Sequence, residues 1–338
     1  MSVWVPLLVA GAVTAGVLPL LARRLGLVDQ PVERSTHTLP VPRVGGLAIA
    51  VGLGAGAVLA VVLAHGALDD IQAWMAYLLP ALLFLGIGVL DDLGRLGSAR
   101  KFMLQAAAAA LAVALGLRWE GTGVAPFGDL VFGPGTALMS WLWIVAVVTM
   151  INFLDGLDLI TAATAAVLLG AAAGAGAGPG DGALYAVALG SVLGFVPWNR
   201  APARSFLGDG GTHLLGFLLA TAALHVPGST SALVWPLASA PLLPGVIDIG
   251  WGLIMKARHG VNLAKAHNQH LSQRLVHAGW SHAAVAWRYG VLAVLALGLV
   301  AWVGPRYGVG VLVGVSLAIL LLHLLHVRVA ARTIPHRF

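Results

Sequence analysis

The sequence predicts an all-α polytopic membrane protein with about eleven transmembrane helices, its N-terminus outside the cell and its C-terminus in the cytoplasm. Of the 338 residues, 59% are hydrophobic and only 9% are charged, and the mean hydropathy is +0.93. Soluble domains carry about 25% charged residues, so this composition excludes an ordinary soluble fold. Apolar runs of about 20 residues without strand-like alternation favour helices that cross a bilayer.

The apolar segments follow one another along the whole chain, which we read as a single integral membrane domain, 1–338. The first has no basic region before it and is followed by Arg23 and Arg24, so we expect a retained span rather than a cleaved secretory signal. Gly and Ala are abundant in the segments, as close helix packing in lipid favours. The predicted spans are 2–22, 45–65, 71–90, 102–117, 136–153, 159–178, 183–198, 211–227, 232–255, 284–303 and 308–327.

The positions of Lys and Arg predict the orientation. Of 19 basic residues, all but Arg118 and Arg306 lie in or beside the polar segments that follow odd-numbered spans. Because basic residues mark the cytoplasmic side, these segments are the predicted cytoplasmic loops. The formal charge of +6 therefore reflects topology and argues against a nucleic-acid partner, and the absence of cysteine excludes thiolate metal sites. The loops are 23–44, 91–101, 154–158, 199–210 and 256–283.

The stretch NFLDGLD at 152–158 places an amide, Asn152, and two carboxylates, Asp155 and Asp158, between two apolar runs. An Asp at the centre of a membrane helix costs about 2.5–3.5 kcal/mol, and ionisable residues kept in such places usually mark a functional site. The structural alternative is a polar turn at the membrane edge, with Gly156 breaking the helix.

Two further acidic motifs lie at span ends. VLDDLGR at 89–95 places Asp91 and Asp92 side by side, and neighbouring carboxylates can hold a metal or act as a base. SFLGDGGT at 205–212 opens the eighth span, where glycines let backbone N–H groups approach an anion and Asp209 could ligate a hard cation. The structural alternatives are a hydrated span end and an N-cap by Asp209.

Basic and amide residues gather in two more cytoplasmic loops. HNQH at 267–270 precedes Arg274, and on a helix His267, His270 and Arg274 would share a phosphate-binding face. The first loop carries ERSTH and then PRVGG, which includes Arg43. A hydrophilic connector and a Pro/Gly turn are the structural alternatives. Together, five loops on one membrane face carry the groups that an anionic substrate and a hard metal require.

In this order, DDLGR, NFLDGLD, FLGDGGT and HNQHLSQRL resemble the motifs of the polyprenyl-phosphate N-acetylhexosamine-1-phosphate transferases, glycosyltransferase family 4. The resemblance covers almost the whole chain. The first loop and the HxxHxxQR form look most like the branch that primes O-antigen and lipopolysaccharide synthesis. Arg95 stands where the family often has Lys, and Gly211-Thr212 where it often has a small residue and Ser, but every acidic group is kept, so we expect an active enzyme.

The resemblance implies transfer of N-acetylhexosamine-1-phosphate from a UDP-sugar to undecaprenyl phosphate, with release of UMP. The reaction would occur at the cytoplasmic face of the bacterial inner membrane and use Mg²⁺, with Mn²⁺ as the alternative metal. Asp209 would bind the metal with help from Asn152. The implied catalytic residues are Asp91, Asp92, Asp155 and Asp158, and the implied substrate-binding residues are Lys101, Asn152, His267, His270, Arg274 and Arg43. Asp248, inside the ninth span, would support the site or the helix packing.

A proton-coupled secondary transporter of an anionic solute is the main alternative, since broken helices with intramembrane Asp and His also describe carriers. Carriers bind near the bilayer midplane, whereas these polar groups gather at one face. A purely structural membrane protein would leave the clustered acids unexplained. The sequence leaves open the sugar, the glycan pathway, whether displacement is single or passes through a phospho-aspartyl intermediate, and whether the protein forms a homodimer.

Overall fold

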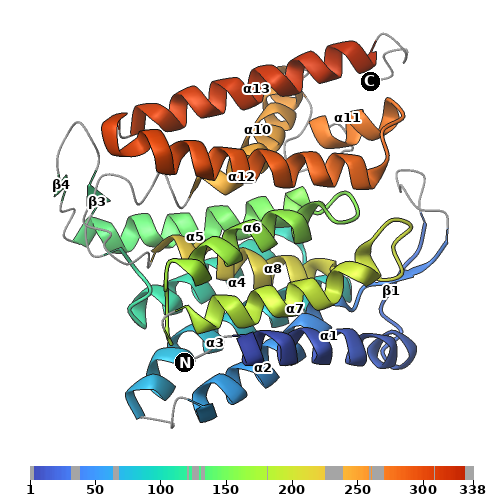
Figure 1. The fold of residues 1–338 in the computed structure, drawn as a ribbon. Helices are drawn as coiled ribbons and strands as arrows, with labels where there is room; N and C mark the ends of the chain where they lie inside the picture. The colour runs from blue at the N-terminus through green and yellow to red at the C-terminus, as the bar shows by residue number, and fades with distance from the viewer. Residues whose placement is uncertain are drawn as a thin grey trace.

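The computed structural model describes residues 4–31, 39–63, 68–119, 122–123, 129–130, 134–180, 182–224, 239–258, 260, 270–307 and 309–331, and it is built almost entirely of helices (Figure 1). The main helices are α1 (Trp4–Arg24), α2 (Gly45–Leu63), α3 (Leu68–Asp92), α4 (Ser98–Ala114), α5 (Pro134–Leu154), α6 (Ile160–Gly174), α7 (Ala183–Asn199), α8 (Gly208–Leu224), α10 (Leu243–Arg258), α12 (His282–Tyr307) and α13 (Val309–Ala331). The short elements are η1 (Ala240–Leu242), α11 (Leu271–His277) and two antiparallel ribbons, β1 (Val28–Asp29) with β2 (Val41–Pro42) and β3 (Thr122–Gly123) with β4 (Asp129–Leu130).

Each of the eleven predicted segments overlaps one main helix, and the all-α membrane prediction is confirmed at that level. Among the described residues, six helices are long and apolar enough to cross a membrane. The apolar helices α6 and α7 have only 15 and 17 residues. At 1.5 Å per residue they reach about 22–26 Å, less than the roughly 30 Å of a hydrocarbon core. The count of eleven spans and the predicted orientation therefore stay predictions.

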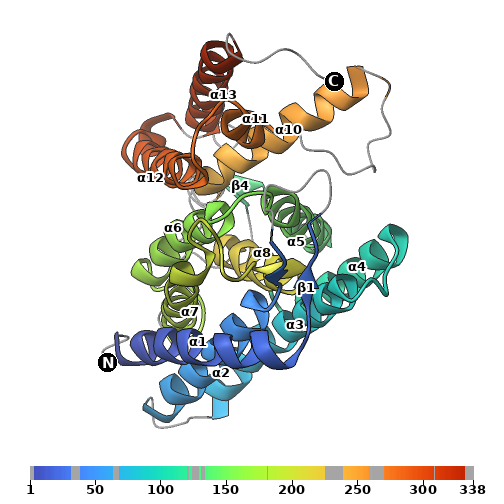
Figure 2. The same cartoon turned by 90° about the vertical axis from the view of Figure 1, so that its right-hand side faces the viewer.

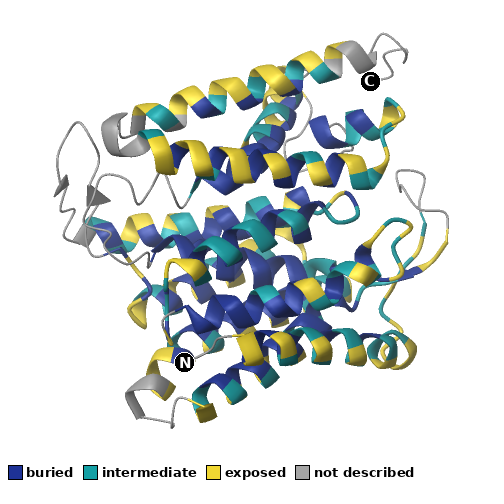
Figure 3. Cartoon of the chain, viewed as in Figure 1, coloured by how far each residue is buried: buried dark blue, intermediate teal, exposed yellow. Residues whose placement is uncertain are grey.

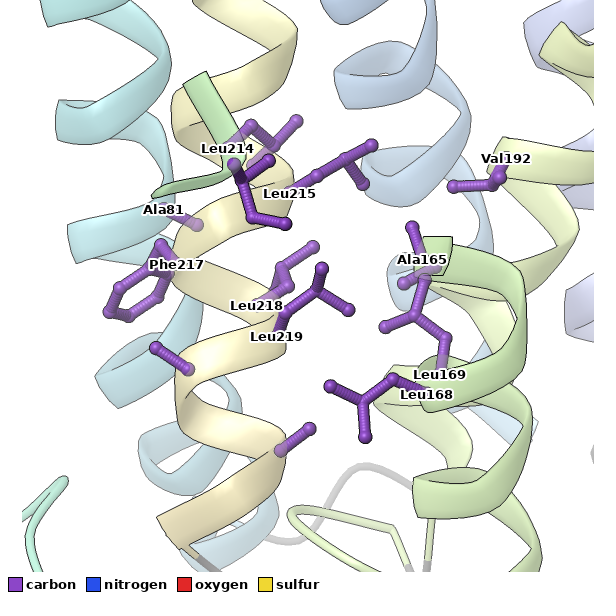
Figure 4. Packing of buried hydrophobic residues seen from close by; sticks show 14 of the residues in the cluster. Ala81, Ala165, Leu168, Leu169, Val192, Leu214, Leu215, Phe217, Leu218 and Leu219 are labelled. Carbon is purple, nitrogen blue, oxygen red and sulfur yellow. The ribbon is translucent and has the colours of Figure 1, made fainter. Parts of the chain in front are cut away.

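Helix α8 is the centre of the fold. Every residue from Gly210 to Leu224 is buried, as expected for a helix that is apolar on all sides. Figure 2 shows the helix enclosed by α2, α3, α5 and α6, all of which contact it. Phe217 stacks on Phe84 of α3 with ring centroids 5.2 Å apart, and Figure 4 shows Leu218 and Leu219 directed toward Leu168 and Leu169 of α6.

Small residues allow the N-terminal helices to pack closely beside this centre. Helix α1 contacts α2 and α7, and Gly11 of α1 lies against the backbone of Gly190 in α7. A second cluster, which includes Leu243, Leu292 and Ile319, joins α10, α12 and α13. These helices form a separate group beyond α5 and α6 in Figure 1.

The outward faces of the helices are apolar. Trp287 and Trp302 of α12 and Leu321 of α13 are exposed, and Figure 3 shows exposed residues along the outer sides of both helices. Lipid would cover such surfaces in a bilayer, so their exposure agrees with the membrane assignment.

Candidate active site

Five segments meet at one end of the N-terminal helices. They are the loop before α2, the end of α3, the start of α4, the end of α5 and the start of α8. Backbone hydrogen bonds join the first segment to the last: Gly45 N–H donates to the Phe206 carbonyl at 3.0 Å and Gly46 N–H to the Leu207 carbonyl at 2.8 Å. The PRVGG and FLGDGG motifs are thus parts of one structure.

Glycines make this approach possible. A Cβ on Gly46 would overlap the backbone of Gly211, and a Cβ on Gly88 would overlap the carbonyl group of Asp209. Gly208 begins α8 with φ of +73°, a backbone conformation that favours glycine. These glycines therefore bring α2 and α3 into direct backbone contact with the start of α8.

Replacing Gly88 with Ala is expected to destabilise the protein by about 1–3 kcal/mol, because the added methyl group must displace the backbone that carries Asp209. The thermal midpoint in detergent and the transfer activity should both fall. Gly86→Ala is the matched control on the same helix, since a Cβ there meets nothing within 4 Å. Equal midpoints for the two variants would contradict the close packing of α3 on α8.

Asp92 caps the start of α8. Its Oδ1 accepts the Asp209 N–H and its Oδ2 accepts the Gly210 N–H, each at 3.0 Å. The first N–H groups of a helix have no partner within the helix, and the helix dipole favours a negative charge there. The Asp92 side chain is only 3% exposed, so water can hardly replace these bonds. The cap of α8 thus comes from α3 rather than from Asp209.

Asp209 lies in the first turn of α8 and faces the end of α5. Asn152 Nδ2 donates to Asp209 Oδ1 at 2.9 Å and to Thr212 Oγ1 at 3.0 Å. The Asp209 side chain is 34% exposed, the most open of the three clustered acids. Burial, contact with Asp91 and the charge of Asp92 raise the pKa of Asp209 to about 7.

Two cations border these acids. Lys101 Nζ donates to Asp91 Oδ2 at 2.6 Å and lies 3.8 Å from Asp209 Oδ2. Arg43 donates to Asp29 Oδ1 at 2.6 Å and lies 3.7 Å from Asp92 Oδ1. We name this group, Asp91, Asp92, Asp209, Asn152, Lys101 and Arg43, the acidic cluster.

The acidic cluster fits a metal ion that takes some of its ligands from the protein and the others from water and a substrate. Within the described ranges, no three acidic or histidine side chains could hold a metal ion by themselves. Mg²⁺ usually takes one or two carboxylates and completes its shell with water and substrate phosphate. Asp209 has the most exposed side chain of the three clustered acids, and the amide oxygen of Asn152 takes no part in the two bonds described above. A cation would offset the neighbouring carboxylate charges, which add to burial in raising the pKa of Asp209.

The loop 155–158 connects the acidic cluster to the C-terminal helices. Burial and the charges of Asp92 and Asp158 raise the pKa of Asp155 to about 7, so its carboxyl group lies near enough to respond to the acidic cluster. Asp158 instead pairs with His282 at the start of α12, Oδ2 to Nδ1 at 3.2 Å. A Cβ on Gly156 would lie 2.8 Å from the side-chain nitrogen of Gln273 in α11.

Asp248 holds α11 in place. The buried Asp248 carboxylate accepts the backbone N–H groups of Leu271 and Ser272, and Tyr289 of α12 donates its hydroxyl to Asp248 Oδ2 at 2.7 Å. His270 Nδ1 lies 3.9 Å from Asp248 Oδ1. The side chain predicted to support the site thus joins α10, α11 and α12.

The predicted site residues divide into two groups. The structure brings together the acidic cluster, and the charge of Asp92 acts on Asp155. Asp158, His270 and Arg274 lie on or beside the neighbouring loop and α11, where Asp158 pairs with His282 and His270 lies near Asp248. His267 lies outside the described residues.

Sequence reasoning missed several supporting residues. Asp29 holds Arg43, and Asn199 joins two motif loops by accepting the Leu159 N–H at 2.8 Å and donating to the Ser205 carbonyl at 3.1 Å. His213 and Gln105 contact each other in the interior. Because His213 directly follows the FLGDGGT motif, its position in the sequence could have indicated a supporting role. Nothing near Asp29 or Asn199 in the sequence indicated such a role.

Comparisons with known proteins point to the same family as the motifs. Residues 74–226 match the family described as glycosyl transferase family 4. The chain is 31% identical to decaprenyl-phosphate N-acetylglucosaminephosphotransferase of Mycobacterium tuberculosis, covering 85% of this chain and 77% of that one, and 32% identical to the protein of the same name in Mycobacterium leprae, covering 85% and 78%. It is 30% identical to a Bacillus subtilis protein named probable undecaprenyl-phosphate N-acetylglucosaminyl 1-phosphate transferase, covering 83% and 76%.

Proposed function

We propose a function on the following premise: this chain belongs to glycosyl transferase family 4, among its polyprenyl-phosphate N-acetylhexosamine-1-phosphate transferases. The proposed reaction transfers N-acetylglucosamine-1-phosphate from UDP-N-acetylglucosamine to undecaprenyl phosphate and releases UMP. The names of the similar proteins support the choice of sugar within the wider class of N-acetylhexosamines. Priming of O-antigen, which the first loop and the HxxHxxQR form favour, stays a prediction, as does the cytoplasmic position of the site, and the oligomeric state stays open.

The observation that carries the proposal is a convergence of side chains from four helices, in which the consecutive helices α3 and α4 meet α5 and α8 from later in the chain. The converging residues are Asp91, Asp92, Lys101, Asn152 and Asp209. The reaction brings a phosphate monoester against a diphosphate, so negative charges must be neutralised where the two meet. Carboxylates that can bind a divalent cation, next to a lysine and an arginine, provide that chemistry.

The contacts favour different roles for the clustered acids. Asp209 and the amide oxygen of Asn152 would hold Mg²⁺. When bound, the metal neutralises charge on the diphosphate and on the departing UMP. Lys101, shared between Asp91 and Asp209, would bind substrate phosphate, and Arg43, which lies beside Asp92, would do so as well.

Asp91 is the better candidate for the base that accepts a proton from the lipid phosphate. Asp92, which the sequence also predicted as catalytic, already accepts two backbone N–H groups. Its contacts favour a role in positioning Asp209. Asp155 and Asp158, which the resemblance implies as catalytic, would act at the nucleotide end of the site. His267, His270 and Arg274, implied as substrate-binding, would hold the diphosphate.

The transporter alternative receives no support from the described geometry. The acidic cluster lies at helix ends, namely the last turns of α3 and α5 and the first turns of α4 and α8, with Arg43 in the loop before α2. A carrier site would be expected near the middle of the spans.

The test is UMP release by protein purified in detergent, supplied with Mg²⁺, undecaprenyl phosphate and, separately, the UDP derivatives of N-acetylglucosamine, N-acetylgalactosamine and their 6-deoxy forms. We expect release only when lipid phosphate and metal are both present, and fastest with UDP-N-acetylglucosamine. Faster release with another sugar would correct the donor. No release with any sugar, from protein with a sharp thermal transition, would contradict the proposal, and solute uptake by vesicles without UMP release would favour transport.

A further inference from the structure

Helices α4 and α8 are joined by two side-chain contacts one helical turn apart. The first contact is Lys101 of α4 with Asp209 of α8, 3.8 Å between Nζ and Oδ2. The second is Gln105 of α4 with His213 of α8, 2.6 Å between the two Nε2 atoms. Because residues four apart lie on the same face of a helix, the contacts repeat in step along both helices.

The second contact is buried and its hydrogen positions follow from the chemistry. His213 is 0% and Gln105 3% exposed. His213 Nδ1 lies 2.6 Å from the Asp209 carbonyl oxygen, which can only accept, so Nδ1 carries the hydrogen. In the neutral ring Nε2 is then an acceptor, and the Gln105 amide donates to it. A directed chain of hydrogen bonds therefore runs from Gln105 through His213 to the backbone of Asp209.

The Gln105–His213 contact ties α4 to α8 and adds to the restraints that α4 receives from its other neighbours near Lys101. Helix α4 packs mainly on α3 and α5, and Gly97 at its start provides no side-chain cap. Phe102, Met103 and Leu104, directly after Lys101, are exposed. Trp141 of α5 donates to the Ala106 carbonyl at 2.8 Å, but this bond lies on the α5 side and does not reach α8.

We propose that Gln105 and His213 are positioning residues for Lys101. Their contact sets the rotation and register of α4 against α8, so that the Lys101 ammonium group lies between Asp91 and Asp209, where the substrate phosphates must arrive. A rotation of α4 would carry Lys101 away from both acids, since Gln105 and Lys101 share one face. The inference rests on the proposed function and adds two residues to it.

A double-mutant cycle separates positioning from simple structural support. Lys101→Met is expected to lower kcat/KM by about 100-fold. Gln105→Leu, which removes the donor but keeps an apolar side chain of similar size, should lower kcat/KM by about tenfold when Lys101 is present. If Gln105 acts through Lys101, adding Gln105→Leu to Lys101→Met should change kcat/KM by less than about twofold.

A loss in the double variant equal to the product of the two single losses would overturn the proposal. Thr221→Val is the control, because it removes a buried hydroxyl that contacts Tyr185 elsewhere on α8 and should lower the thermal midpoint without changing kcat/KM. Gln105→Met repeats the cycle if Gln105→Leu does not fold, and failure of both to fold would assign a structural role and overturn the proposal. Absence of UMP release by the unmodified protein would count against the proposed function instead.

Discussion

Replacing Asp209 with Asn is expected to lower UMP release by about a thousandfold or more, because the substitution removes the open carboxylate of the acidic cluster. The amide has nearly the same shape, and Asn152 can still donate to its oxygen, so the fold should persist. The measurement is kcat with saturating lipid phosphate and nucleotide sugar over a range of Mg²⁺ concentrations.

The same variant should be at least as stable as the unmodified protein when no ligand is present. Asp209 lies among Asp91 and Asp92, and burial, followed by the contact with Asp91 and the repulsion of the Asp92 charge, raises its pKa. A neutral amide relieves that repulsion, so the thermal midpoint without metal should stay level or rise while activity is lost. Activity within tenfold of the unmodified protein would contradict a metal-binding role for Asp209. A lowered midpoint would indicate a structural role.

The sequence predicted the positions of the helices and the membrane class because both depend on local composition. Runs of apolar residues near 20 in length leave few alternatives to a spanning helix. The motifs were informative for a similar reason: Asn152, Asp91 and Asp209 each end or begin an apolar run, where a polar group needs an explanation. The family resemblance, confirmed by the comparisons, rests on these same residues.

The roles of particular side chains could not be predicted, because they depend on which helices touch. Asp91 and Asp92 are adjacent and chemically identical in the sequence. Only the contact of α3 with α8 gives Asp92 two backbone N–H groups and leaves Asp91 to Lys101. Likewise, a single sequence does not show that Asp29 faces Arg43 across a two-stranded ribbon.

The number of spans depends on where each helix ends, and the apolar pattern of the sequence predicts those ends only approximately. Residues 159–178 read as one apolar run, but α6 ends at Gly174, where glycines with positive φ at Gly176 and Gly178 follow. Glycine adopts the positive φ that ends a helix without steric cost, whereas inside a helix it costs about 0.5–1 kcal/mol relative to Ala. Apolar character alone therefore predicted a longer helix than the chain forms.

The adjacent acids of α3 should respond differently to the same substitution. Asp92→Ala leaves the N–H groups of Asp209 and Gly210 without their acceptor in a place that water reaches poorly. Each unsatisfied buried group costs about 1–3 kcal/mol. We expect a large fall in the thermal midpoint together with loss of transfer, and a smaller fall for Asp92→Asn, which keeps one acceptor oxygen.

Asp91→Ala provides the comparison on the same helix. Its carboxylate accepts from the Lys101 side chain rather than from backbone, and Lys101 retains Asp209 nearby. Activity should therefore fall about 100-fold or more if Asp91 is the base, with a much smaller change in thermal midpoint than for Asp92→Ala. Paired measurements of midpoint and kcat on the two variants decide the assignment. Equal destabilisation by the two substitutions would contradict the assignment of Asp92 to positioning and Asp91 to catalysis. A stable but inactive Asp92→Ala variant would indicate that Asp92 takes part in the reaction itself.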